Sequence, residues 1–219
     1  MSNISKLEEI ATQIRHCQKC DLHKSRTNTV PGDGAPDAKL IIIGEAPGAQ
    51  EDKQGLPFVG PAGKILIEAL TNIGLERKDV FITNTVKCRP PENRDPLPEE
   101  KSTCANYLEE QISIIKPKIF LLLGKHSLQK VFPDANITSE HGKFKIKAGH
   151  LYFITFHPAA TIYNQALRPQ LFQDFKILAK IIHKIEELAP IIDKLTETKA
   201  EKYVILLHKK MTEIFRASP

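Results

Sequence analysis

Four cysteines are the residues of this sequence whose type and spacing point most directly to chemistry. They form a close pair, two residues apart, and a wider pair, fifteen residues apart: Cys17 with Cys20, and Cys88 with Cys104. Four thiolates can hold a zinc ion or an iron–sulfur cluster, whereas two disulfides do not fit a reducing compartment. The spacing predicts a metal centre and leaves zinc and iron–sulfur equally open.

Three predicted strands end at polar or glycine-rich residues. A glycine-rich segment, 44–48, follows the first strand, Asn84 lies near the end of the second, and His157 follows the fourth. Parallel α/β proteins bind ligands beyond the carboxyl ends of their strands. A single histidine or asparagine at such a place is more often only packed, but the combination predicts a pocket at one rim of the sheet.

The elements that position these residues follow from the hydrophobic pattern. Continuous apolar runs predict buried strands over 39–44, 80–86, 119–123 and 150–156. Apolar residues at helical spacing predict helices over 5–17, 61–74, around Cys104 as far as Pro117, over 127–132 and over 170–187, with a long loop over 44–63. Strands that alternate with helices predict an α/β fold, a three-layer αβα sandwich with a central four-stranded parallel sheet.

The C-terminal part of the sequence differs from the rest. Pro190 is expected to end the preceding helix. Apolar residues then recur at four-residue spacing: Tyr203, Leu207, Met211 and Phe215. This pattern predicts one further amphipathic helix, packed on the body of the protein in preference to a partner. We therefore divide the chain into a domain over 1–188 and a helical C-terminal extension over 189–219.

The composition is that of a globular protein. The chain has 219 residues, of which 41% are hydrophobic and 26% charged, enough for one sizeable domain. Its formal net charge of +5 permits a polyanionic partner without requiring one. No apolar run approaches the roughly 20 residues of a membrane span, and the N-terminus lacks the pattern of a secretory signal. We expect a cytoplasmic protein with no membrane contact.

Four segments are similar to the motifs of a known family. They are GEAPGAQEDKQGLPFVGPAGKIL (44–66), FITNTVKCRPPENRDP (81–96), LLLGKHSL (121–128) and FHPAATIYN (156–164). In this order and spacing they resemble the family-4, iron–sulfur uracil-DNA glycosylases, from about Cys17 to about Lys184. The resemblance implies a base excision repair hydrolase. Such an enzyme flips deoxyuridine from single- or double-stranded DNA, cleaves the N-glycosidic bond and leaves an abasic site.

The resemblance assigns the two central polar roles. His157 matches the catalytic histidine, which would donate to uracil O2 as negative charge develops there. Asn84 matches the asparagine that reads the base. Its amide oxygen can accept from N3–H of uracil and its NH₂ group can donate to O4. Cytosine has a bare N3 and an amine at these places, so both hydrogen bonds would be mismatched.

The remaining uracil contacts are also implied by the resemblance. Phe58 matches the aromatic residue that stacks on the base, and Glu51 matches the glutamate that excludes the C5 methyl group of thymine. Glu45 and Ala46 match further uracil contacts, Ala46 through its backbone N–H. Since Ala46 provides no carboxylate, the attacking water would be held by backbone groups or a neighbouring carboxylate.

The resemblance bears on the metal and on DNA as well. The four cysteines match the family's [4Fe–4S] ligands, which favours that cluster over zinc and implies an architectural role. Candidate DNA contacts lie at helix starts, in the loop after the second strand and after His157: Lys64, Lys87, Arg89, Ser127, Tyr163, Asn164 and Arg168. We expect a monomer, and a replication-clamp partner is not readable from the sequence.

One alternative is a non-catalytic iron–sulfur DNA-binding or redox protein on the same scaffold. It predicts an eroded pocket, whereas Glu45, Phe58, Asn84 and His157 are all present. No lysine stands where a lyase would need a Schiff base, and the motif of zinc-dependent deaminases does not occur. The sequence therefore favours a monofunctional uracil-DNA glycosylase.

Overall fold

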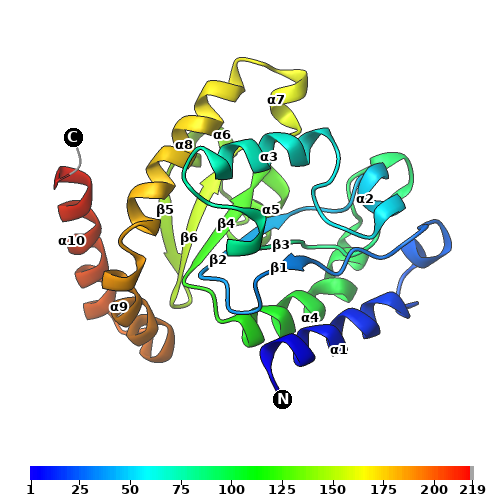
Figure 1. The fold of residues 1–219 in the computed structure, drawn as a ribbon, viewed down its shortest axis with the longest axis horizontal. Coiled ribbons are helices and arrows are strands. Elements are labelled where there is room, and N and C mark those ends of the chain that lie inside the picture. Colours follow the sequence, from blue (N-terminus) through cyan, green and yellow to red (C-terminus); the bar gives the residue numbers. More distant parts are fainter. Residues whose placement is uncertain (218–219) are drawn as a thin grey trace.

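A six-stranded sheet forms the centre of the computed structural model, which describes residues 1–217 (Figure 1). Its strands in chain order are β1 (Asp33–Gly34), β2 (Leu40–Gly44), β3 (Phe81–Asn84), β4 (Ile119–Leu123), β5 (Phe144–Lys147) and β6 (His150–Thr155). Their order across the sheet is β1-β3-β2-β4-β6-β5. The inner strands β3, β2, β4 and β6 are parallel, so the predicted four-stranded parallel sheet is confirmed.

The two edge strands, β1 and β5, were not predicted, and both pair antiparallel with their neighbours. β1 is only two residues long and has no apolar pattern. β5 alternates apolar residues with Lys145 and Lys147, a pattern typical of an edge strand with one solvated face. A tight turn at Ala148 and Gly149, both with positive φ, connects it to β6.

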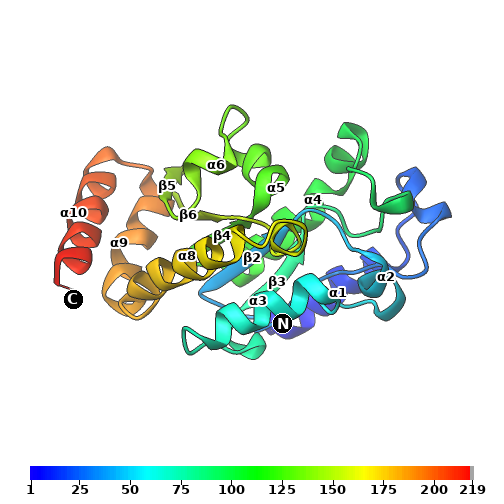
Figure 2. The same ribbon diagram turned by 90° about the horizontal axis from the view of Figure 1, so that it is seen from above.

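Helices cover both faces of the sheet. They are α1 (Asn3–Arg15), α2 (Ala49–Gln54), α3 (Pro61–Thr71), α4 (Pro98–Ile115), α5 (Gly124–Val131), α6 (Ile137–Glu140), α7 (Ala160–Tyr163), α8 (Leu167–Ile182), α9 (Ile185–Thr198) and α10 (Glu201–Ala217). Figure 2 shows α3 and α8 on one side of the strands and α4 and α5 on the other. This arrangement confirms the three-layer αβα sandwich. The short helix α2 lies inside the segment 44–63, where the pattern had predicted a continuous loop.

Alternating residues of each inner strand pack into different layers. In β2, Ile42 joins a core cluster with Leu66 of α3 and Phe175 of α8. Its neighbour Ile43 joins a second cluster with Leu108 of α4. Because both faces of the strands are covered, they read as unbroken apolar runs in the sequence.

The C-terminal extension consists of two helices instead of the predicted one. The chain leaves helical geometry at Lys184, so α8 ends at Ile182 and Pro190 lies inside α9. The expected break at Pro190 is therefore wrong. Leu207 and Met211 of α10 are buried in the same core cluster as the sheet, which confirms the predicted packing on the body. Figures 1 and 2 both show α9 and α10 side by side at one end of the molecule.

None of the helices within residues 1–217 combines the length and apolar character that crossing a membrane requires.

Candidate active site

The four parallel strands end at one pocket of about 340 Å³. Glu45 follows β2, Asn84 ends β3, Gly124 follows β4, and His157 lies just beyond β6. All six residues predicted to contact uracil line this pocket: Glu45, Ala46, Glu51, Phe58, Asn84 and His157. A larger and more open hollow of about 830 Å³, beside α1, contains none of them. The strand ends thus gather the predicted residues in one place, as expected of a parallel sheet.

His157 presents a defined hydrogen-bond donor. Its Nδ1 accepts a hydrogen bond from the backbone N–H of Ala159 over 3.1 Å, so the neutral ring carries its proton on Nε2. Burial lowers the pKa of His157 to about 4, nearby His126 acting in the same direction and Glu51 opposing. The ring is therefore uncharged near neutral pH, with its one N–H at Nε2.

Gly44 provides the space that Asn84 and Phe58 occupy. Gly44 and Asn84 are register partners in β2 and β3. A Cβ atom at Gly44 would lie 2.3 Å from Oδ1 of Asn84 and 2.9 Å from the ring of Phe58. Asn84 is only 2% exposed, and its backbone oxygen accepts a hydrogen bond from Lys87 Nζ. The amide is thus held at the pocket by a close approach that only glycine permits.

Phe58 is held in a strained backbone conformation. Its φ of 52° lies in the left-handed region, which bulky residues rarely adopt. A Cβ at Gly63 would lie 2.0 Å from the Phe58 oxygen, so the helix start at α3 packs directly on this strained residue. The Phe58 and His157 ring centroids are 5.6 Å apart. Strain of this kind is concentrated at functional sites because the surrounding structure must enforce it.

Glu51 has a structural role in addition to its predicted one. Its Oε1 accepts hydrogen bonds from the backbone N–H groups of Val59 and Gly60, each over 2.9 Å. These groups precede the first turn of α3, where a negative charge is favoured. Glu51 therefore fixes the loop that carries Phe58 while lining the pocket.

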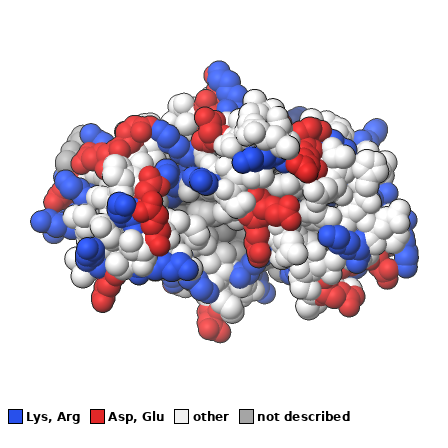
Figure 3. Space-filling model, turned by 90° about the horizontal axis from the view of Figure 1, so that it is seen from below, with Lys and Arg blue, Asp and Glu red and all other residues white. Residues whose placement is uncertain are grey.

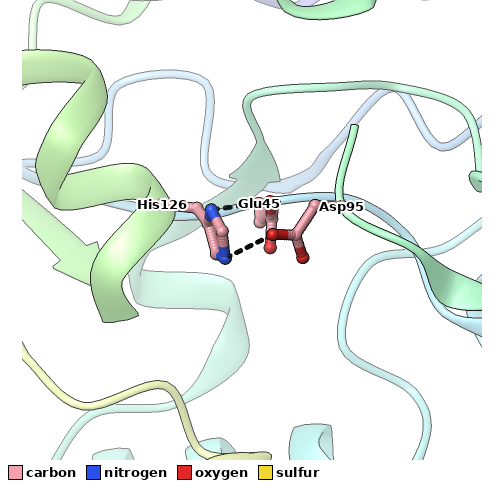
Figure 4. Close-up of side chains that lie close together, drawn as sticks. All are labelled: Glu45, Asp95 and His126. Atoms are coloured by element: carbon pink, nitrogen blue, oxygen red, sulfur yellow. Dashed lines mark ion pairs between the residues drawn. The ribbon is translucent and has the colours of Figure 1, made fainter. Parts of the chain in front are cut away.

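Glu45 meets two residues that the sequence analysis did not single out, Asp95 and His126. His126 Nδ1 lies 3.2 Å from Glu45 Oε1, and His126 Nε2 lies 3.3 Å from Asp95 Oδ2 (Figure 4). Burial, together with the nearby Asp95 charge, raises the pKa of Glu45 to about 7, with Lys101 opposing the shift. Both missed residues lie in motif segments, and His126, like His157, closely follows the end of a parallel strand.

The four free cysteines converge on a small cavity between α1, α4 and the segment after β3. Cys88 and Cys104 are buried, and Cys17 and Cys20 are half-buried. Two sulfur atoms also accept hydrogen bonds. Lys87 N–H donates to Cys104 Sγ over 3.3 Å, and Arg26 Nη1 donates to Cys88 Sγ over 3.0 Å. N–H groups that donate to sulfur commonly surround thiolate ligands, so these residues fit a four-thiolate metal centre.

The chain is similar to proteins of one known family. Residues 31–179 match the family model of the uracil DNA glycosylase superfamily. The chain is 49% identical to the type-4 uracil-DNA glycosylase of Sulfurisphaera tokodaii over 193 residues, 84% of each chain. It is 44% identical to that of Archaeoglobus fulgidus, over 81% of this chain and 94% of the relative. Its identity to that of Thermotoga maritima is 40%, over 81% and 95% respectively.

The chain belongs to the uracil-DNA glycosylase superfamily. The resemblance read from the four motif segments is thereby confirmed.

Two of the DNA contacts expected of such a glycosylase are wrong. Lys87 is only 1% exposed. Its Nζ donates to Thr83 Oγ1 over 2.5 Å, to the Asn84 oxygen over 3.0 Å and to Gln111 Oε1 over 2.7 Å. Burial lowers the pKa of Lys87 to about 7. The side chain is thus part of the support beneath Asn84 and is out of reach of a phosphate.

Ser127 is the second incorrect contact. It is 1% exposed, and its hydroxyl donates to the backbone oxygen of Leu123 over 2.7 Å. The side chain therefore points back into the first turn of α5, a local bond that serine often makes in helices.

The other residues predicted to contact DNA are exposed or half-buried: Lys64, Arg89, Tyr163, Asn164 and Arg168. Their role stays a prediction. Tyr163 is 91% exposed and lines the pocket. Arg168 pairs with Glu68 over 2.6 Å. On the face in Figure 3, basic and acidic side chains are interspersed, so that face offers DNA no continuous basic surface.

Proposed function

We propose that this chain removes uracil from DNA as a monofunctional glycosylase, hydrolysing the bond between C1′ and N1 and leaving an abasic site. The observation that carries the proposal is the uncharged His157 ring, with its proton on Nε2, in the same pocket as Asn84. Membership of the superfamily and similarity to type-4 uracil-DNA glycosylases support it.

His157 stabilises the leaving group. When the C1′–N1 bond breaks, its electron pair stays with uracil and negative charge spreads onto O2. The Nε2–H donates to O2 more strongly as this charge grows, so the interaction lowers the barrier more than it strengthens substrate binding. A single donor of this kind contributes about 3–4 kcal/mol. An uncharged ring fits this role, since the pKa of His157 is about 4.

Asn84 and its neighbours select the base. The Asn84 amide accepts from uracil N3–H and donates to O4, whereas cytosine would leave both groups mismatched. Phe58 stacks on the base from its strained position beside His157. Glu51, fixed by two backbone N–H groups, occupies the space that the thymine methyl group would need.

Water completes the reaction. It attacks C1′ of the cationic sugar, forms the new C–O bond and releases one proton, which offsets the negative charge of the departed uracil. Glu45 and Ala46 line the pocket, and we assign the water to the Glu45 carboxyl group and the backbone N–H of Ala46. Holding a water molecule and a deoxyuridine in fixed orientation supplies much of the rate enhancement in such reactions.

The four cysteines would hold a [4Fe–4S] cluster. Their convergence on one cavity and the N–H groups that donate to two sulfurs support this assignment. The cluster would join the end of α1, the segment after β3 and α4 by bonds stronger than side-chain packing. Its contribution is thus to hold the segment between β3 and α4 beside the pocket.

The wider organisation follows the same proposal. Residues 1–188 form the glycosylase domain, residues 189–219 extend it, and the chain acts as a monomer. DNA is contacted through Lys64, Arg89, Tyr163, Asn164 and Arg168. A DNA substrate and four free cysteines support a cytoplasmic site of action.

A non-catalytic protein on the same scaffold is the competing proposal. Such a protein would bind DNA through the rim and gain nothing from a fixed histidine tautomer. The bond from Ala159 to His157 and the close approach of Gly44 to Asn84 favour the enzyme.

The decisive experiment uses purified protein and three matched oligonucleotides that contain one U, T or C in the same sequence. We expect abasic sites, detected by alkaline cleavage, only in the uracil substrate. Strand cleavage without alkali would contradict a monofunctional enzyme. Tight binding to the uracil oligonucleotide with no abasic sites would favour the non-catalytic alternative.

A further inference from the structure

Three segments of the chain meet at one histidine beside the pocket. Glu45 follows β2, Asp95 lies in the segment between β3 and α4, and His126 lies in the first turn of α5. Figure 4 shows the Glu45 and Asp95 carboxyl groups close together on one side of the His126 ring, with each ring nitrogen paired to one of them. His126 Nδ1 is 3.2 Å from Glu45 Oε1, and its Nε2 is 3.3 Å from Asp95 Oδ2.

This arrangement needs an additional proton. A neutral imidazole has one N–H and one bare nitrogen. Here each ring nitrogen lies close to a carboxylate oxygen. If the ring were neutral and both carboxylates ionised, the lone pair of the bare ring nitrogen would lie against a lone pair of the nearby oxygen. The contact becomes favourable when the ring is an imidazolium or when one carboxyl group is protonated. Protonation of Glu45 and protonation of His126 are therefore coupled through this contact.

The two carboxyl groups occupy different environments. The Glu45 side chain is 21% exposed and lines the pocket, whereas that of Asp95 is 71% exposed. Glu45 Oε1 is buried, and no group within residues 1–217 makes a well-directed hydrogen bond to it. The nearest donors are His126 Nδ1 and Lys101 Nζ, at 3.2 Å and 3.8 Å.

The surrounding charges act in opposite directions on the group. Burial and the nearby Asp95 charge raise the pKa of Glu45, Lys101 of α4 opposes the shift, and the net value is about 7. Burial lowers the pKa of His126; Asp95 raises it, and Lys101 and Lys125 lower it further. His157, also in the pocket, is uncharged near neutral pH. The charge of Glu45 thus changes near neutrality, with Asp95 and Lys101 acting on it in opposite directions.

We propose that His126 and Asp95 are positioning residues that set the charge of Glu45 beside the bound deoxyuridine, His126 favouring the carboxylate and Asp95 opposing it. The inference rests on the proposed function, because the charge matters only when a sugar cation forms in the pocket. An ionised Glu45 stabilises that cation by Coulomb attraction, and a protonated Glu45 does not. Excision would then depend on pH through a group other than His157, the donor to uracil O2.

The test is the pH dependence of the single-turnover rate of uracil excision between pH 5 and 9. Wild-type protein should lose activity as pH falls through neutrality. The acid limb of the pH profile is this fall in rate at low pH. His126→Ala removes the ring nitrogen that lies 3.2 Å from Glu45 Oε1, so the acid limb should move upward by about 1 pH unit. Asp95→Asn removes the repelling charge, so the limb should move downward. Glu45→Gln should remove the limb and lower the plateau rate by on the order of 10- to 100-fold.

Two further variants separate charge control from packing. His126→Asn can place an amide N–H near the position of Nδ1, so it should return the limb toward the wild-type pH. His150 is a histidine at the start of β6, packed on Phe120 and remote from the pocket, and His150→Ala should leave the limb unchanged. Circular dichroism and thermal unfolding verify that each variant is folded.

The outcomes distinguish this inference from the proposed function. A wild-type protein that produces no abasic sites would overturn the proposed function. Suppose that wild type excises uracil but the acid limbs of the pH–rate profiles of folded His126→Ala and Asp95→Asn do not move in opposite directions. The inference about His126 and Asp95 would then be wrong, and the proposed function would stand. Persistence of the same acid limb in Glu45→Gln would also overturn the inference, since another group would then be titrating.

Discussion

The backbone N–H of Ala159 donates to Nδ1 of His157 across 3.1 Å. Ala159 follows His157 by two residues, after an intervening proline, in the turn that leads into α7. This hydrogen bond is local and is maintained whenever the turn is formed. The backbone next to His157 therefore fixes which ring nitrogen carries the proton. The donor that uracil would meet is therefore Nε2–H.

Replacing His157 by alanine should slow the chemical step by about 10²–10³-fold, which corresponds to roughly 3–4 kcal/mol. Binding of uracil-containing DNA should change little, because the hydrogen bond strengthens mainly in the transition state. Single-turnover kinetics at saturating enzyme measure the first quantity, and fluorescence anisotropy measures the second. A folded variant within about threefold of the wild-type rate would show that His157 only packs the end of β6.

The low pKa of His157 gives a separate pH prediction. Burial places it at about 4 instead of the ordinary value of 6.5, so the ring takes up a proton only well below neutrality. Once protonated, Nδ1 can no longer accept from Ala159, and the ring loses its fixed orientation. In Glu45→Gln, where no other acid limb is expected, the rate should stay level down to about pH 5 and fall only below it. A midpoint near 6.5 in that variant would contradict the lowered pKa of His157.

Asn84 should control which base is accepted. Asn84→Asp should admit cytosine, since a carboxyl group can accept from the cytosine amine where the amide donates. Asn84→Ala should reduce uracil excision by at least about 10²-fold, because it removes two hydrogen bonds to the base. Abasic-site assays on matched U and C oligonucleotides measure both effects. Undiminished uracil excision by Asn84→Ala would exclude the role.

Gly44→Ala tests the close approach at the pocket floor. The new Cβ would lie 2.3 Å from Oδ1 of Asn84 and 2.9 Å from the Phe58 ring, so both side chains must move. We expect excision to fall by more than about 10²-fold, as misplacement of positioning groups by 1 Å does elsewhere.

Gly74→Ala is the matched control for this variant. Gly74 has a φ of 76°, and a Cβ there would meet nothing within 4 Å. It should lower the free energy of unfolding by about 1 kcal/mol through backbone strain and leave the excision rate unchanged. Equal losses of activity in the two glycine variants would show that Gly44 matters for folding alone.

The cysteine centre predicts about four iron atoms per chain in protein purified without oxygen, with the brown colour of a cubane cluster. Cys88→Ala should lose iron and lower thermal stability, because the link between α1 and the segment after β3 is broken. Thr103→Ala is the control, since Thr103 lines the same cavity and offers no thiolate. Stoichiometric zinc in a colourless preparation would overturn the iron–sulfur assignment.

Local pattern alone was enough to predict the parallel sheet and the gathering of site residues. Unbroken apolar runs such as that of β2 can only be buried on both faces, and parallel strands must place Glu45, Asn84 and His157 at one edge. The stripe of Leu207 and Met211 likewise required a covered helix face. These features depend on the period of the side chains along the chain, which the sequence contains in full.

Side-chain direction and environment were decided only by the tertiary structure. Lys87 reads as a basic loop residue, yet Thr83 and Gln111 provide acceptors that make its burial favourable. His126 and Asp95 read as two unrelated polar residues, and they become neighbours of Glu45 because three distant segments meet there. The physical reason is common to these cases. Hydrogen bonds, burial and charge depend on distances between segments far apart in the chain, and periodicity carries no information about those distances.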